Sequence, residues 1–150
     1  MSEIIAAAAG FLIAVLWFDL MFDVQVLPHR RSAEVPQTAV ESISAYYRRV
    51  TTTASPMGRL VGLVMVVLLA ALVVQAVSGD LPLLVSAVSI PAGLLAIGLA
   101  VLRVFGRARR LGNRKDPAAM QSEIARSIFR DHLICLAAMT ILLSTQLIGA

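Results

Sequence analysis

Two aspartates, Asp19 and Asp23, lie four residues apart at the end of the otherwise apolar stretch LWFDLMFDVQV. Side chains at this spacing share one face of an α-helix. An ionised carboxylate inside a membrane is costly, so two on one face need a cation, a shared proton or a metal ion to offset them. The chemistry that such a pair can supply is proton exchange, acid–base catalysis or ligand binding.

Other ionisable side chains are expected at the same membrane level as the two aspartates. The residues that the spans deliver there are Arg59, Arg103, Arg130, Asp131 and His132, with His29 and Arg30 close behind the first span. The candidate catalytic groups are Asp19, Asp23 and His132. The candidate binding residues are Arg59, Arg103, Trp17 and His29, although Trp17 also fits an aromatic girdle at the membrane interface.

Three interpretations of the aspartates are open. The favoured one is ion pairing with Arg59 or Arg103, because intramembrane charges usually pair with one another. The second is a functional pocket, in which desolvation and the neighbouring carboxylate make Asp19 able to exchange a proton. A metal site is the third, but the spacing of the ligands it needs, Asp19, Asp23, His29 and His132, matches no metal motif. No metal is therefore predicted, and no cofactor is identified.

The elements that must position these residues follow from the composition. Hydrophobic residues make up 59% of the 150 residues, charged residues 15%, and the mean hydropathy is +0.85. Four apolar runs, at about 4–22, 60–78, 83–102 and 133–149, match a hydrocarbon core of about 30 Å. Backbone exposed to lipid must satisfy its own hydrogen bonds, which favours helices. We predict an all-α, four-helix membrane bundle formed by one domain, residues 1–150.

The basic residues predict the orientation of the bundle. All 13 Lys and Arg residues fall within residues 30–59 and 103–130, which connect spans one and two and spans three and four. The positive-inside rule places both segments in the cytoplasm and both termini outside. This distribution accounts for the isoelectric point near 10.2 without a nucleic-acid partner. The lipid bilayer is the expected partner, and a disulfide within the chain is excluded because Cys135 is its one cysteine.

Both basic segments are predicted to contain helix. Residues from Pro36 to about Thr52 have apolar side chains at helical spacing, which predicts an interfacial helix with Tyr46 and Tyr47 at headgroup level. Asp116 and Pro117 suit the N-cap and first position of a final helix of about 30 residues, which includes the fourth span. The predicted packing stripe at its start is Met120, Ile124 and Ile128.

The overall plan resembles the anthrone-oxygenase-like group of small bacterial four-span membrane proteins. The stretches that carry the resemblance are AAAAGFLIAVLWFDLMFDVQVLP, VESISAYYRRVT and RDHLICLAAMTILL. The group's Asn-x-Pro-Leu-Asn stretch is replaced here by LGNRKDP. The resemblance implies a multi-pass protein of a bacterial inner membrane that binds or acts on a hydrophobic, aromatic or quinone-like molecule. Pro28 and His132 are the only individual residues to which the resemblance extends.

Three functions fit these features. The favoured one is an accessory or structural subunit that packs against other membrane subunits or a second copy, because small residues line several spans. The second is a small membrane enzyme, oxygenase-like, that acts on or binds a lipophilic molecule. The third is a proton-coupled transporter that works as an oligomer, because four helices leave little room for a pathway.

Overall fold

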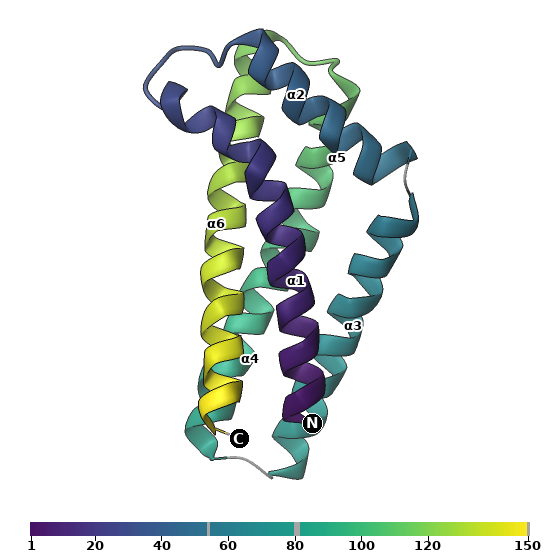
Figure 1. The fold of residues 1–150 in the computed structure, drawn as a ribbon, viewed down its shortest axis with the longest axis vertical. Coiled ribbons are helices and arrows are strands. Elements are labelled where there is room, and N and C mark those ends of the chain that lie inside the picture. The colour runs from purple at the N-terminus through teal and green to yellow at the C-terminus, as the bar shows by residue number, and fades with distance from the viewer. Residues whose placement is uncertain (54, 80–81, 150) are drawn as a thin grey trace.

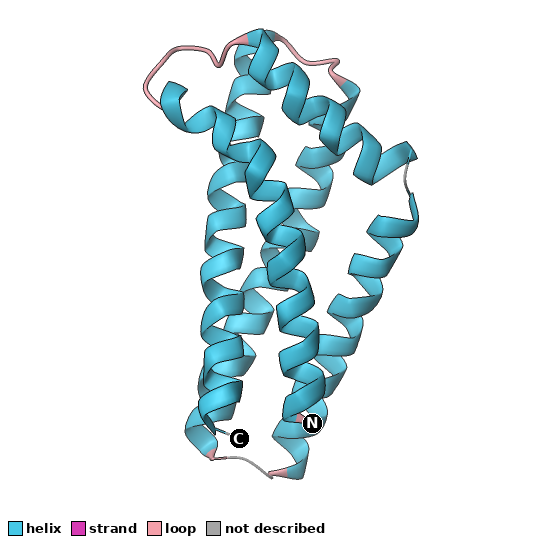
Figure 2. Cartoon of the chain, viewed as in Figure 1, coloured by secondary structure: helices cyan, strands magenta, loops and turns pink. Residues whose placement is uncertain are grey.

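The computed structural model describes residues 1–53, 55–79 and 82–149, and within them the regular structure is entirely helical (Figure 2). Its helices are α1 (Ser2–Asp23), α2 (Gln37–Arg48), α3 (Ser55–Ser78), α4 (Leu83–Leu99), α5 (Phe105–Asn113) and α6 (Ala118–Gly149). Shorter helical turns are a 3₁₀ segment, Val24–His29, and two π-helical turns, Arg49–Thr53 and Ala100–Val104. Together they confirm the predicted all-α bundle.

Four segments of the described residues are long and apolar enough to cross a membrane. They are Ser2–His29, Pro56–Ser78, Leu83–Asn113 and Ala118–Gly149. Both termini lie at one end of the bundle, and α2 and α5 lie toward the other (Figure 1). We call the second end the basic end, because residues 30–59 and 103–130 contain all 13 Lys and Arg residues.

Apolar side chains from all four spans form the core of the bundle. Ile5 and Leu12 of α1 and Leu68 of α3 pack with Met139 and Leu142 of α6. These five side chains are 0–4% exposed. Other large apolar side chains cover the outer surface, where a lipid bilayer rather than water suits them.

A second apolar cluster fixes α2 across the basic end. Val40, Ile43 and Tyr47 of α2 pack against Leu111 of α5 and Ile128 of α6. The helix predicted after Pro36 is therefore present, over Gln37–Arg48. Within the predicted α6 stripe Ile124 is also buried, but Met120 is 39% exposed, so that part of the prediction is wrong.

The chain also departs from the sequence prediction after the third span. The segment after Leu102, predicted as a connection, continues as the π-helical turn and then α5. Alanine, arginine and leucine favour helix in this segment, and the helix continues through Gly112 and ends at Asn113. A Cβ on Gly112 would lie 2.9 Å from the Arg48 backbone nitrogen, so α2 and α5 pack closely. The connection between the second and third spans includes Asp80 and Leu81, which lie outside the described residues.

Candidate functional site

Asp23 lies at the centre of a buried polar cluster between α1, α2 and α6. Its side chain is fully buried, with one carboxylate oxygen 2.7 Å from Nδ1 of His132. The hydroxyl of Tyr47 donates to the other oxygen at 2.7 Å. A buried carboxylate needs such partners on both oxygens, and two different helices supply them.

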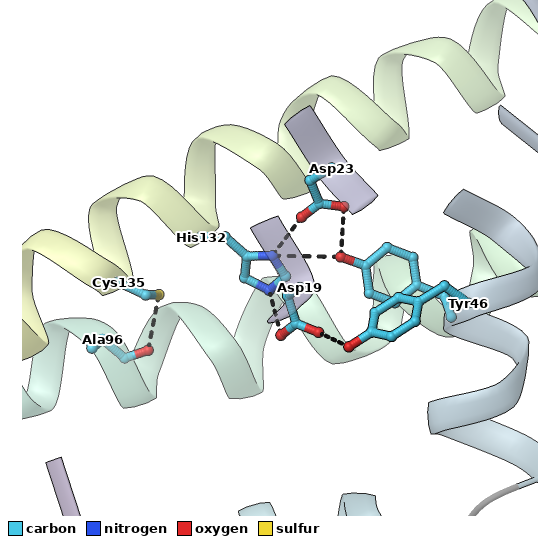
Figure 3. A network of polar contacts seen from close by, with 7 residues as sticks. Asp19, Asp23, Tyr46, Ala96, His132 and Cys135 are labelled. Atoms are coloured by element: carbon cyan, nitrogen blue, oxygen red, sulfur yellow. Dashed lines mark hydrogen bonds and ion pairs between the residues drawn. The ribbon is translucent and has the colours of Figure 1, made fainter. Parts of the chain in front are cut away.

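Asp19 lies one helical turn before Asp23 and faces the same imidazole (Figure 3). Its Oδ2 is 3.7 Å from Nε2 of His132, and its Oδ1 accepts a hydrogen bond of 2.6 Å from the hydroxyl of Tyr46. The ring of His132 thus lies between the two carboxylates, with one ring nitrogen toward each. In its protonated form, the imidazole in this position offsets the repulsion between two like charges on one helix face, and in its neutral form it leaves one ring nitrogen able to accept a proton.

The two tyrosines act as hydrogen-bond donors to the aspartates. Burial, followed by the charge of Asp23, raises the pKa of Tyr47 well above its ordinary value, and burial and Asp19 do the same to the pKa of Tyr46. Both phenols therefore remain protonated at neutral pH. The ring of Phe22 stacks on that of Tyr46 at a centroid distance of 4.1 Å, which holds this hydroxyl toward Asp19.

The predicted ion pairing of the aspartates with Arg59 or Arg103 is wrong among the described residues. Nε of Arg103 lies 3.2 Å and NH1 of Arg107 2.9 Å from the carboxylate of Asp131. Asp131 precedes His132 on α6, so the two side chains are about 100° apart around the helix. Asp131 therefore meets the basic continuation of the third span, while His132 meets Asp19 and Asp23.

A cavity of about 340 Å³, which we call the main cavity, adjoins the cluster between α1, α2, α3 and α5. Its polar lining comprises Asp19, Tyr46, Tyr47, Thr51, His132, Arg59 and Arg109, and its apolar lining includes Val15, Met57, Val61 and Phe105. Asp23 is not among the lining residues. Its volume and mixed lining are typical of sites that bind small molecules.

A smaller cavity of about 50 Å³ continues from the cluster toward the middle of the bundle. It shares Asp19 and His132 with the first cavity and is otherwise lined mainly by apolar side chains, including Leu12, Met65 and Met139. Cys135 also lines it, and its thiol donates to the carbonyl of Ala96 at 3.4 Å (Figure 3). The polar groups of Asp19 and His132 thus lie between the 340 Å³ cavity and the smaller, mainly apolar cavity.

The remaining predicted site residues lie elsewhere. Trp17 is 63% exposed on α1, and it lines neither cavity. His29 ends the 3₁₀ segment, where its carbonyl accepts a hydrogen bond of 2.9 Å from Arg126. Within residues 1–53, 55–79 and 82–149, no group of three or more His, Cys, Asp or Glu side chains is arranged to hold a metal ion. The four-ligand metal alternative therefore has no support.

The sequence missed the role of the two tyrosines and of Arg109. Tyr47 belongs to the apolar stripe of α2, a signal that it is buried, but its spacing does not reveal a partner. Arg109 is one of several clustered arginines, and nothing in the sequence separates it from Arg107 or Arg110.

The fold defines the class of the chain as a small helical protein with spans of membrane length. No model of a protein family, no curated protein and no solved structure matches the chain.

Proposed function

We propose that this small integral membrane protein binds a lipophilic molecule in the main cavity and exchanges a proton with it through Asp19 and His132. The observation that carries the proposal is the position of these two side chains. They belong to a buried ionisable cluster and also line a cavity large enough for a small molecule. Ionisable groups in a mainly apolar cavity are typical of functional sites.

The hydrogen bonds assign a role to each member of the cluster. Asp23 is fully buried and accepts the proton on Nδ1 of His132, so it orients the imidazole as a positioning residue. Nε2 is then the ring nitrogen available to Asp19 and to a bound molecule. Tyr46 holds Asp19, which leaves the second Asp19 oxygen 3.7 Å from Nε2. A hydroxyl placed there can pass its proton to Nε2 or to Asp19.

The class of the molecule follows from the lining. Phe105, Met57 and Val61 offer an apolar surface that suits a ring, while Asp19 and His132 suit a hydroxyl or carbonyl oxygen. The resemblance to anthrone-oxygenase-like proteins supports the same choice, an aromatic or quinone-like molecule. By the positive-inside rule the cavity would open on the cytoplasmic half of a bacterial inner membrane.

The test uses 2-naphthol, a lipophilic phenol whose neutral and ionised forms absorb at different wavelengths. We expect saturable binding to the full chain in detergent, with part of the bound probe ionised. Asp19→Asn is expected to weaken binding about tenfold, the loss of one good hydrogen bond to a charged group, and to reduce the ionised fraction.

The matched control is Gln146→Leu, which alters a buried polar side chain three residues before the end of α6, at the opposite end of the bundle. It is expected to leave both readouts unchanged. Absence of saturable binding to the unaltered protein would contradict the proposal. Equal effects of Asp19→Asn and Gln146→Leu would contradict it as well, because the binding would then depend on general stability.

A second candidate, assembly with partner subunits or a second copy, is favoured by one face of α1. In the described part of the chain, nothing lies within 4 Å of the position that a Cβ on Gly10 would take. Ala6 and Ala14 lie on the same face, and small residues let membrane helices approach closely. Gly10→Leu is expected to reduce the mass of the purified assembly, measured by light scattering, whereas Val73→Leu on exposed α3 surface does not. An unchanged mass would contradict this candidate.

A further inference from the structure

The two arginines that line the main cavity differ from several other arginines of the basic end. Several of those have partners: Arg103 and Arg107 meet Asp131, Arg110 meets Asp116, and Arg114 meets Glu41. Among residues 1–53, 55–79 and 82–149, no carboxylate lies within 4.0 Å of Arg59 or Arg109. They come from different helices, α3 and α5, and both line the same cavity.

The cavity therefore changes in character with depth. Arg59 and Arg109 are exposed and form its mouth. Asp19 and His132 are buried, with side chains 15% and 5% exposed, and lie between the main cavity and the narrow one. Beyond them the narrow space is bounded by side chains such as Leu12 and Met139. From the mouth inward, the lining therefore changes from positive charge to hydrogen-bonding groups and then to apolar side chains.

We infer that the molecule bound in this cavity is an anionic amphiphile, whose carboxylate or phosphate is held by Arg59 and Arg109. The inference rests on the proposed function and names the class of its ligand. Guanidinium groups bind both anions with strong, charge-assisted hydrogen bonds.

The charge arrangement fixes the orientation of such a molecule. The carboxylate of Asp19 repels an anion, so the anionic end remains at the mouth. The opposite end, with its hydroxyl or carbonyl oxygen, then meets Asp19 and His132. One molecule can satisfy both polar regions only if it carries oxygen groups at two positions of an apolar body.

The test compares 6-hydroxy-2-naphthoic acid with its methyl ester, which differ in charge and by one methyl group at the end opposite the hydroxyl. The full chain is placed in nanodiscs of phosphatidylcholine, and binding is followed by naphthalene fluorescence. We expect the acid to bind at least about tenfold more tightly than the ester. Arg59→Gln and Arg109→Gln are each expected to weaken binding of the acid by about that factor and to leave the ester unchanged.

Arg31→Gln is the matched control, because it removes the same charge from an exposed residue of the basic end that does not line the cavity. It is expected to have no effect. Equal binding of acid and ester would overturn the inference while the proposed function stands. Equal loss in Arg31→Gln would also overturn it, because the preference would come from general surface charge. Failure of both compounds and of 2-naphthol to bind would reject the proposed function itself.

Competition then separates the two sources of the anion. Displacement of the bound acid by 10-hydroxydecanoate supports a carboxylate, and displacement by 10-hydroxydecyl phosphate supports the phosphate of a lipid headgroup. Displacement by neither competitor, at concentrations up to its solubility limit, would overturn the inference.

Discussion

Two buried polar clusters lie at opposite ends of the same bundle, and they differ in chemistry. At the end of the termini, Gln75 of α3 and Gln146 of α6 exchange amide hydrogen bonds of 3.0 and 2.9 Å. The amide of Gln146 also donates to the hydroxyl of Ser89 at 2.9 Å. All three side chains are neutral and 0–2% exposed, and none of them lines the two cavities described above.

The cluster at the basic end contains charge-bearing groups and has open space beside it. Asp19, Asp23 and His132 have ionisable side chains, and two of them line a cavity. A buried polar group within a bundle is therefore not in itself a sign of function. The glutamine cluster joins helices, as interhelical amide bonds in membranes commonly do. Only the combination of ionisable groups with a cavity indicates a site.

The largest expected effect is that of removing the centre of the ionisable cluster. Asp23→Ala leaves the hydroxyl of Tyr47 and Nδ1 of His132 without their acceptor in a buried space. We expect a loss of about 3–5 kcal/mol in the free energy of unfolding, the usual cost of breaking a buried pair. Unfolding by titration with sodium dodecyl sulfate measures it, and Asp23→Asn is expected to lose less. A cost no larger than that of Gln146→Leu would remove the distinction between the clusters.

The next effect is a pH dependence that the two tyrosines report directly, since Tyr46 and Tyr47 are the two tyrosines of the sequence. Burial and the aspartates raise the pKa of both phenols above the ordinary value of 10.0. Their contribution to stability is complete below pH 10.0 and is lost as the pH rises through the folded-state values. Near-ultraviolet absorbance is therefore expected to show tyrosinate at higher pH in folded than in unfolded protein.

The same titration distinguishes the clusters. Asp19→Asn removes one negative charge beside Tyr46 and is expected to bring tyrosinate formation to lower pH. Gln146→Leu is expected to leave the curve unchanged. Tyrosinate appearing at the same pH in folded and unfolded protein would show that the phenols are not donors to the aspartates.

The smallest effect is expected at the glutamine cluster. Gln146→Leu removes the bonds to Gln75 and Ser89, and interhelical bonds of this kind contribute about 1 kcal/mol or less each. We expect a decrease of this order in the free energy of unfolding, measured as for Asp23→Ala. A loss of naphthol binding in this variant would contradict the separation of the two ends.

Hydropathy predicted the spans well because lipid imposes a length and an apolar surface that each helix must meet alone. Likewise, Asp116 and Pro117 come just before the start of α6 at Ala118. Partners across helices were harder to predict, because they depend on how each helix is rotated against its neighbours. The sequence predicted correctly that the aspartates and His132 lie at one level of the bundle. It paired Arg103 with the aspartates instead of Asp131, and it placed the tyrosines among lipid headgroups rather than against the aspartates.

The π-helical turn Ala100–Val104 in the third span has a consequence for how this chain can change in evolution. A π turn holds one residue more than an α turn. Every later residue is therefore rotated by about 100° around the helix axis, compared with its position in an uninterrupted α-helix. Deleting one residue here would restore a regular α-helix and leave Arg107 against Asp131, whereas the unchanged sequence wound as a regular α-helix would put Gly106 in that place. The turn thus uncouples the membrane-facing half of this helix from its arginine-rich continuation, so mutation and selection can adjust each surface separately.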